Sequence, residues 1–181
     1  IEDLTVAFGR GSRRTQVVHG VSLSVRHGEI VGLVGESGSG KTLTALACAD
    51  LLPEQAETTT SKWRFENRDL RSANRKQRAA TLGGRLAVVF QDPMSALNPA
   101  RRVGAQVIDT ARVHARLSKD EALDAAVDRF RRVRIAAPER RLHEYPHAFS
   151  GGMRQRAMIA MGLMVTPTLL IADEPTTALD V

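Results

Sequence analysis

The chain has 181 residues, of which 43% are hydrophobic and 25% are charged, and its formal net charge is +6. This length and composition indicate one globular domain with a real core and room for a subdomain. No apolar run approaches the roughly 20 residues of a membrane span, and the start lacks the layout of a signal peptide. Cys48 is the only cysteine, which excludes an intrachain disulfide and a cysteine-based metal cluster and fits a reducing cytosol.

The positive charge permits a nucleic acid or an anionic membrane surface as a partner. The basic residues are spread over four stretches, at 10–14, 71–78, 101–102 and 129–134. Surfaces that bind bases usually interleave aromatic rings with such residues, and Trp63 and Tyr145 are the only Trp and Tyr here. The sequence therefore favours solvated arginines over a nucleic-acid interface.

The first elements along the chain are predicted strands. Residues 1–8 and 17–25 alternate apolar and polar side chains, which predicts two strands of a hairpin joined by a polar, basic turn. The apolar, β-branched run at 29–34 predicts a buried parallel strand. Residues 42–52 are rich in Leu and Ala and predict a helix that ends at Pro53.

Between that strand and that helix lies a glycine-rich loop that fully matches G-x-x-x-x-G-K-[ST]. Glycines let the backbone curl so that successive N–H groups point at phosphate oxygens, and the helix N-terminus favours negative charge. Lys41 would reach the β- and γ-phosphates, and the Thr42 hydroxyl would bind Mg²⁺. The predicted phosphate-binding residues are Gly35, Glu36, Ser37, Gly38, Ser39, Gly40, Lys41 and Thr42.

The middle of the chain predicts mixed elements followed by helices. The predicted order is an exposed strand at 61–70, a polar helix at 71–80, a buried strand at 86–90, two helices within 103–133, an irregular connector at 138–149, a helix from the N-cap Ser150 to 165, and a buried strand at 168–172. We expect residues 1–100 and 167–181 to form a nucleotide-binding core with a β-subdomain, and residues 101–166 to form a helical subdomain.

Polar residues follow two of the predicted buried strands. Asp173 and Glu174 come directly after the last one, so their carboxylates are expected near the phosphate loop. Asp173 would hold Mg²⁺, directly or through water, and Glu174 would orient or deprotonate an attacking water. Gln91 follows the earlier strand and has a neutral amide that suits both Mg²⁺ and water. From chemistry alone, this role and that of a polar loop residue are equally open for Gln91.

Ser150, Gly151 and Gly152 begin a predicted helix with a hydroxyl and exposed N–H groups. This arrangement is typical of an anion site, and the alternative is an ordinary capped helix. The methionines further along the same helix, at 158, 161 and 164, favour core packing.

Four stretches together resemble the nucleotide-binding subunits of ABC transporters, and most closely the ATPases of oligopeptide, dipeptide and nickel importers. They are GESGSGKT at 35–42, VVFQDPMSALNP at 88–99, YPHAFSGGMRQRAMIAMGL at 145–163 and LLIADEPTTALDV at 169–181. The resemblance implies an α/β fold: a P-loop NTPase (RecA-like) core with an N-terminal antiparallel β-subdomain and an inserted α-helical subdomain. Phe149 and Met153 stand where the familiar signature has Leu and Gln.

The same resemblance implies a subunit that binds and hydrolyses ATP with Mg²⁺ and energises import of peptides or a related solute through ATP-driven dimerisation. The implied partners are a second ABC ATPase subunit, identical or not, arranged head to tail, transmembrane permease subunits and, indirectly, an extracytoplasmic solute-binding protein. The implied place is the cytoplasmic face of a bacterial inner membrane, and no nucleic acid is expected. The transported solute cannot be read from the sequence.

The resemblance also assigns residues. Ser150, Gly151 and Gly152 would contact the γ-phosphate of ATP bound to the second subunit, and Asp180 would end the loop that crosses the dimer seam. Gln91 would sense the γ-phosphate. Phe8 is the candidate that would contact adenine; Val18 is an alternative, and a plain core role for Phe8 is equally open.

One feature departs from the resemblance. The family has a histidine after the loop that ends at Asp180, whereas all histidines here precede Asp173, at 19, 27, 114, 143 and 147. None fits that role by order, so we expect a C-terminally truncated domain. Two alternatives follow: a nucleotide-binding fragment without turnover, and a soluble ABC-type ATPase acting on nucleic acid or ribosomes. The QDPM-x-x-LNP stretch argues against the second alternative.

Overall fold

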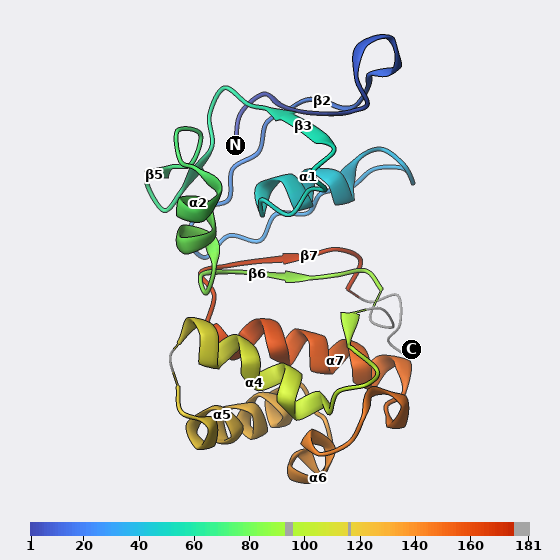
Figure 1. The fold of residues 1–181 in the computed structure, drawn as a ribbon, viewed down its shortest axis with the longest axis vertical. Coiled ribbons are helices and arrows are strands. Elements are labelled where there is room, and N and C mark those ends of the chain that lie inside the picture. The colour runs from blue at the N-terminus through green and yellow to red at the C-terminus, as the bar shows by residue number, and fades with distance from the viewer. Residues whose placement is uncertain (93–95, 116, 176–181) are drawn as a thin grey trace. The chain divides into compact units, whose positions relative to one another are not determined.

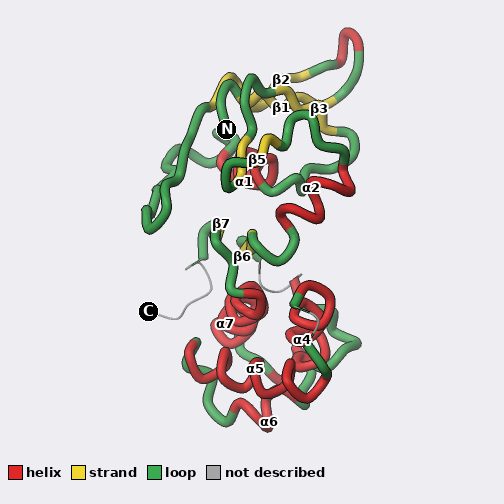
Figure 2. The backbone as a smooth tube through the Cα atoms, turned by 90° about the vertical axis from the view of Figure 1, so that its left-hand side faces the viewer, coloured by secondary structure: helices red, strands yellow, loops and turns green. Residues whose placement is uncertain are grey.

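The computed structural model describes residues 1–92, 96–115 and 117–175. The chain forms two compact units, Ile1–Leu82 and Gly83–Val181, which we call the N-terminal and C-terminal units (Figure 1). Figure 2 shows that the labelled strands β1, β2, β3 and β5 lie in the first unit and that helices dominate the second. Among the described residues, no helix has both the length and the apolar character that a membrane crossing requires.

A three-stranded antiparallel sheet of order β2-β1-β3 forms the core of the N-terminal unit. The strands are β1 (Leu4–Phe8), β2 (Thr15–Val21) and β3 (Ala56–Thr59), and the turn between β1 and β2 holds a short 3-10 helix, η1 (Gly11–Arg13). Leu4 and Val6 of β1 are fully buried and pack with Val18 of β2 and with Ala47 of the helix α1 (Lys41–Cys48). The predicted hairpin and the predicted helix after the loop are confirmed, with shorter bounds.

The predicted buried strand at 29–34 is wrong. The structure places these residues outside every described strand, and Ile30 and Val34 are 98% and 92% exposed. The prediction rested on apolar, β-branched side chains. A strand also requires a neighbouring strand that pairs with its backbone N–H and C=O groups. No described strand pairs with this segment.

The predicted single strand at 61–70 is a tight hairpin instead. Its two-residue strands are β4 (Arg64–Phe65) and β5 (Arg68–Asp69). Glu66 and Asn67 join them with φ values of 46° and 66°, and two positive φ values in succession are typical of a type I′ turn. The polar helix that follows, α2 (Arg75–Leu82), begins four residues later than predicted.

In the C-terminal unit, three helices pack around one apolar core. They are α4 (Val103–His114), α5 (Lys119–Arg132) and α7 (Gly151–Gly162). Val103, Val107 and Ala111 recur every four residues on α4 and are fully buried, as the spacing predicts. The helix α5 begins at a capping box, in which the Ser118 hydroxyl accepts from the backbone N–H of Glu121 and the Glu121 carboxylate accepts from that of Ser118.

The connector at 138–149 is more regular than predicted. It contains the short helix α6 (Pro138–Leu142) and the 3-10 helix η2 (Pro146–Ala148). Each begins with a proline, whose fixed φ suits the first helical position and whose missing N–H costs nothing there. A further 3-10 turn, η3 (Leu163–Val165), follows α7.

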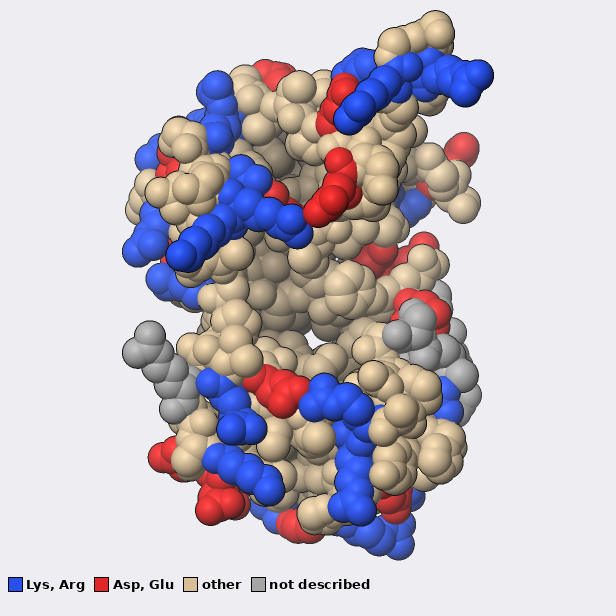
Figure 3. Space-filling view, viewed as in Figure 1, with Lys and Arg blue, Asp and Glu red and all other residues tan. Residues whose placement is uncertain are grey.

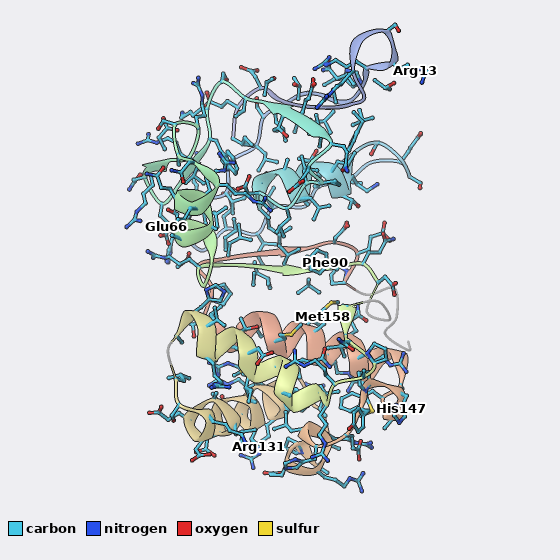
Figure 4. All side chains as sticks on the ribbon, viewed as in Figure 1. Arg13, Glu66, Phe90, Arg131, His147 and Met158 are labelled. Atoms are coloured by element: carbon cyan, nitrogen blue, oxygen red, sulfur yellow. The ribbon has the colours of Figure 1, made fainter. Side chains whose placement is uncertain are left out.

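Two parallel strands complete the C-terminal unit. They are β6 (Leu86–Val89) and β7 (Leu169–Ala172), in register from Leu86 opposite Leu169 to Val89 opposite Ala172. Both strands were predicted, but β7 is not buried on both faces, because Leu170 is 44% exposed. Met158 of α7 is almost fully buried and lies on the side of the helix toward these strands (Figure 4), which supports the predicted core role.

Candidate functional site

The glycine-rich loop and the start of α1 form a first group of candidate residues, in the N-terminal unit. Gly38 and Gly40 have φ values of 77° and 93°, a region that side chains other than glycine rarely adopt. A Cβ on Gly35 would lie 2.8 Å from the Ser39 hydroxyl, and one on Gly40 would lie 3.1 Å from the carbonyl oxygen of Val17. Backbone conformation therefore favours glycine at positions 38 and 40, and close approach of a backbone atom adds to this at Gly40, whereas the Ser39 hydroxyl near Gly35 can rotate away.

Lys41, the first residue of α1, is held against this loop. Its ammonium group donates to the carbonyl oxygens of Gly35 and Glu36 at 2.8 and 2.7 Å. Gly40 is the N-cap of α1 and has no side chain, so the N–H groups of the first turn lack a side-chain cap. A positive charge beside uncapped N–H groups fits a phosphate ligand and agrees with the sequence pattern.

Phe8 and Val18, the two candidates for the adenine contact, lie in the β-sheet of the same unit. Phe8 ends β1, pairs with Thr15 and Ala56 on either side, and packs against the core while remaining half-buried. Val18 is only 2% exposed. A contact between either residue and adenine stays a prediction, and the burial of Val18 favours Phe8.

A second group of candidate residues lies in the C-terminal unit, where β6 and β7 end side by side. The Gln91 amide donates to a carboxylate oxygen of Glu174 at 2.7 Å. The backbone N–H of Asp173 donates to the Val89 carbonyl at 2.9 Å, which extends the parallel pairing one residue past β7. Parallel pairing thus brings Gln91 close to Glu174, from which it is 83 positions away in sequence. Their catalytic and metal-binding roles stay predictions.

Glu174 has an unusual backbone. Its φ is 44°, in the left-handed region, where a residue with a side chain is strained by about 1–2 kcal/mol. Such strain persists only when neighbouring contacts fix the conformation. The carboxylate of Glu174 is exposed and directed to the Gln91 amide, so the turn after β7 presents it at the strand ends.

The Ser150 turn is built as an N-cap. The Ser150 hydroxyl accepts from the Met153 backbone N–H at 3.3 Å, and Gly152 is buried. Phe149, just before it, is 3% exposed, with the Arg141 guanidinium 6.0 Å from its ring centroid. The core thus fixes the start of α7 as predicted. Whether Ser150 and its glycines also bind an anion stays a prediction.

Some predicted positions lie outside the described residues, namely Asp180 with the rest of its loop at 176–181, and Pro93. Within the described ranges, no group of three or more His, Cys, Asp or Glu side chains is arranged to hold a metal ion. The metal-binding roles of Thr42 and Asp173 stay predictions.

Gln155 is a residue at this site that sequence reasoning missed. It lies on α7, is fully buried, and its amide donates to the carbonyl oxygen of Pro175, next to Glu174. The available signal was a polar side chain one turn past the Ser150 cap, on the side of the helix that also buries Gly152 and Met158.

The ABC transporter family profile matches residues 18–177. A probable peptide ABC transporter ATP-binding protein, y4tR of Sinorhizobium fredii, is 50% identical over all of this chain and 54% of its own length. The dipeptide transport ATP-binding protein DppD of Escherichia coli is 44% identical over the whole chain and 55% of its own length. The chain thus spans about half the length of the curated relatives it matches.

Among solved structures, the dimeric structure of MJ0796, a bacterial ABC transporter cassette, is similar over 99% of this chain and 75% of its own. The TM-score is 0.83 and the sequence identity 25%. A post-hydrolysis dimer of MJ0796 with ADP and Pi bound gives the same values. The predicted α/β P-loop NTPase fold is therefore confirmed. With the family profile covering most of its length, this chain belongs to the ABC transporter family.

Proposed function

We propose that this chain is the ATP-binding and ATP-hydrolysing part of an ABC transporter that imports peptides or a related solute of the dipeptide, oligopeptide or nickel type. The observation that carries the hydrolytic part is the Gln91 to Glu174 hydrogen bond of 2.7 Å at the ends of β6 and β7. The peptide class is supported by the names of relatives 42–50% identical, which are peptide, dipeptide and oligopeptide transport proteins.

The loop at 35–42 would bind the phosphates of ATP. Lys41 would exchange its bonds to the loop carbonyls for oxygens of the β- and γ-phosphates, and backbone N–H groups at the start of α1 would complete the anion site. Phe8 would pack against the adenine ring. These contacts bind and orient the nucleotide before any chemistry occurs.

Glu174 would accept a proton from the attacking water, and the Gln91 amide would hold that carboxylate in place. A bound Mg²⁺ would neutralise charge on the β- and γ-phosphate oxygens. Of the residues present, the Thr42 hydroxyl and the Asp173 carboxylate fit it, because hydroxyl and carboxylate oxygens are the ligands that Mg²⁺ prefers. The exposed Glu174 carboxylate would then stay available to accept the proton of the attacking water.

We further propose that two such subunits act head to tail. Ser150, Gly151 and Gly152 of one subunit would contact the γ-phosphate held by the other, with Asp180 at the seam. Dimeric MJ0796 cassettes are similar to this chain, which supports a dimer. Permease subunits would be the further partners, at the cytoplasmic face of the inner membrane, with a solute-binding protein beyond them.

The division into a core of 1–100 with 167–181 and a helical subdomain of 101–166 is likewise part of the proposal. The boundary between the two compact units falls at a different place in the sequence, between Leu82 and Gly83. The importer is preferred over a nucleic-acid ATPase because of the names of the relatives. On the visible face, Lys and Arg form several separate groups with Asp and Glu between them, and this distribution also supports the preference (Figure 3).

The test is phosphate release from Mg-ATP by the purified chain, with nucleotide affinity measured separately by a fluorescent ATP analogue. Glu174→Gln should keep the wild-type affinity and lower turnover by about 10²–10⁴-fold, the usual contribution of a general base. Lys41→Ala should weaken nucleotide binding itself. Undiminished hydrolysis by Glu174→Gln would refute the catalytic assignment. Wild-type binding without any turnover would favour the fragment that binds nucleotide and does not hydrolyse it.

A test of the transported class uses the source organism. Deleting the coding sequence should abolish uptake of labelled dipeptides or oligopeptides, and the wild-type sequence should restore uptake where Glu174→Gln does not. Unchanged peptide and nickel uptake in the deletion strain would contradict the proposed solute class.

A further inference from the structure

The amide of Gln155 is buried inside the C-terminal unit in an unusual state. The residue is fully buried in α7, and its Nε2 donates to the backbone carbonyl of Pro175. Among the described residues, its other amide atom, Oε1, has no hydrogen-bond partner. A buried acceptor without a partner costs folding free energy, so an apolar side chain of similar size would suit a purely structural position better.

The bond from Gln155 lies just past the end of the β6–β7 pairing. The parallel pairing of β6 and β7 extends as far as the N–H of Asp173, which donates to Val89 at 2.9 Å. Glu174 then turns the chain with a φ of 44°, and Pro175 has no N–H to donate. The Pro175 carbonyl is a fixed point just beyond the strained residue, and a side chain from another element holds it.

The helix that supplies this side chain also begins at the Ser150 cap. Ser150 and Gln155 are five residues apart on one helix, with the start of that helix held by the Ser150 hydroxyl and by buried Phe149. A helix transmits displacement as a rigid element over such a distance. The orientation of the turn at Glu174 is therefore tied to the position of the Ser150 turn within the same chain.

We propose that Gln155 is a positioning residue for Glu174: its amide, bonded to the Pro175 carbonyl, sets the direction in which the Glu174 carboxylate leaves β7 and couples it to the Ser150 turn. This inference rests on the proposed function, because it assigns Glu174 as the base. Gln155 itself touches no reacting atom. It acts on kcat through the angle of the carboxylate, and it makes no direct contact with the nucleotide.

The experiment replaces Gln155 by Met, which has a similar length and no donor. Turnover of Mg-ATP by the purified chain should fall at least tenfold, while the affinity for a fluorescent ATP analogue stays within about twofold of wild type, because the phosphate loop is untouched. A wild-type kcat in folded Gln155→Met protein would overturn the proposal. So would an equal loss of affinity and turnover.

The matched control is Gln106→Met. Gln106 is also a nearly buried glutamine on a helix, and its amide holds the loop at 98–101, donating to the carbonyls of Asn98 and Arg101 at 3.0 Å each. Its replacement should lower thermal stability and leave kcat per folded molecule near wild type. A similar drop of kcat in both variants would assign the effect to general loosening of the unit and overturn the specific role of Gln155.

A double variant separates this inference from the proposed function. If Gln155 acts through Glu174, adding Gln155→Met to Glu174→Gln should lower the residual rate no further, whereas independent effects would multiply. A multiplied loss overturns the positioning role. Full activity in Glu174→Gln alone would instead refute the proposed function. Should Gln155→Met fail to fold, Gln155→Asn keeps the amide but shortens its reach. The comparison with Gln106→Met and the double variant with Glu174→Gln then test the positioning role in the same way.

Discussion

Gly104 allows α4 to approach the C-terminal end of α6, and replacing it by a larger residue should measurably destabilise the C-terminal unit. A Cβ at this position would lie 2.5 Å from the backbone oxygen of Leu142 and 3.0 Å from its Cβ. Ordinary contact begins near 3.4 Å, so α4 and the backbone at Leu142 must separate by close to an ångström. That movement also stretches the 2.9 Å bond from the Val103 N–H to the Glu144 carbonyl.

The expected magnitude combines three terms. Overpacking against a backbone atom costs about 1–3 kcal/mol, and weakening the bond from Val103 costs up to about 1 kcal/mol. Replacing a helical glycine by alanine returns about 0.5–1 kcal/mol through lower backbone entropy in the unfolded chain. Gly104→Ala should therefore lower the free energy of unfolding by about 1–3 kcal/mol.

The assay is urea unfolding followed by far-ultraviolet circular dichroism, with Gly162→Ala as the control. Gly162 also lies on a helix, and a Cβ there would meet only the Cβ of Ala87, at 3.4 Å. This variant should be equal to wild type or more stable by up to about 1 kcal/mol, since it gains helix propensity without a clash. Gly104→Ala with wild-type or higher stability would refute the packing argument.

Three further predictions follow from the structure. Burial raises the pKa of the Cys48 thiol, so at pH 8 it should react with a thiol reagent more slowly than free cysteine and speed up on unfolding; equal rates before and after unfolding would contradict this. The Ser118 hydroxyl and backbone N–H lower the pKa of Glu121 in the folded protein. The folding stability that the capping box contributes is therefore fully present above the ordinary pKa of 4.5, and it is lost as the pH falls through the lowered pKa of the folded state. In thermal melts, the stability gap between wild type and Ser118→Ala should therefore be wide at pH 7 and narrow in acid, and a gap independent of pH would count against the box. Gly40→Ala places a Cβ 3.1 Å from the Val17 oxygen in a residue with a φ of 93°, whereas the Cβ of Gly38→Ala, in a residue with a φ of 77°, meets nothing within 4 Å. In a nucleotide titration, Gly40→Ala should therefore weaken affinity more than Gly38→Ala. The reverse order would refute the steric reasoning.

Local patterns predicted the elements that carry their own signals. Val103, Val107 and Ala111 recur at helical spacing, and the structure buries all three on one face of α4. Ser150 was predicted as an N-cap from its place before two glycines, and its hydroxyl accepts the expected backbone bond. The glycine-rich loop was likewise predicted from residue types whose backbone needs are local.

Features that depend on distant partners were predicted less well. The apolar run at 29–34 carries the side chains of a buried strand, but pairing is decided elsewhere in the chain, and no described strand accepts it. Gln155 shows the converse: the sequence offers only a polar side chain on the buried side of a helix, and its partner, the Pro175 carbonyl twenty positions away, is seen only in the structure. The meeting of Gln91 and Glu174 could be predicted because both follow apolar strands.

The exposed segment at 29–34 has a consequence for how the protein behaves in concentrated solution. Ile30 and Val34 present their apolar side chains almost completely to water, in a segment that no described strand pairs. A segment of this kind is a template onto which another chain can add as a strand, and β-branched residues favour that addition. A single charged side chain placed in this segment would therefore change the colloidal stability of the chain more than its resistance to unfolding.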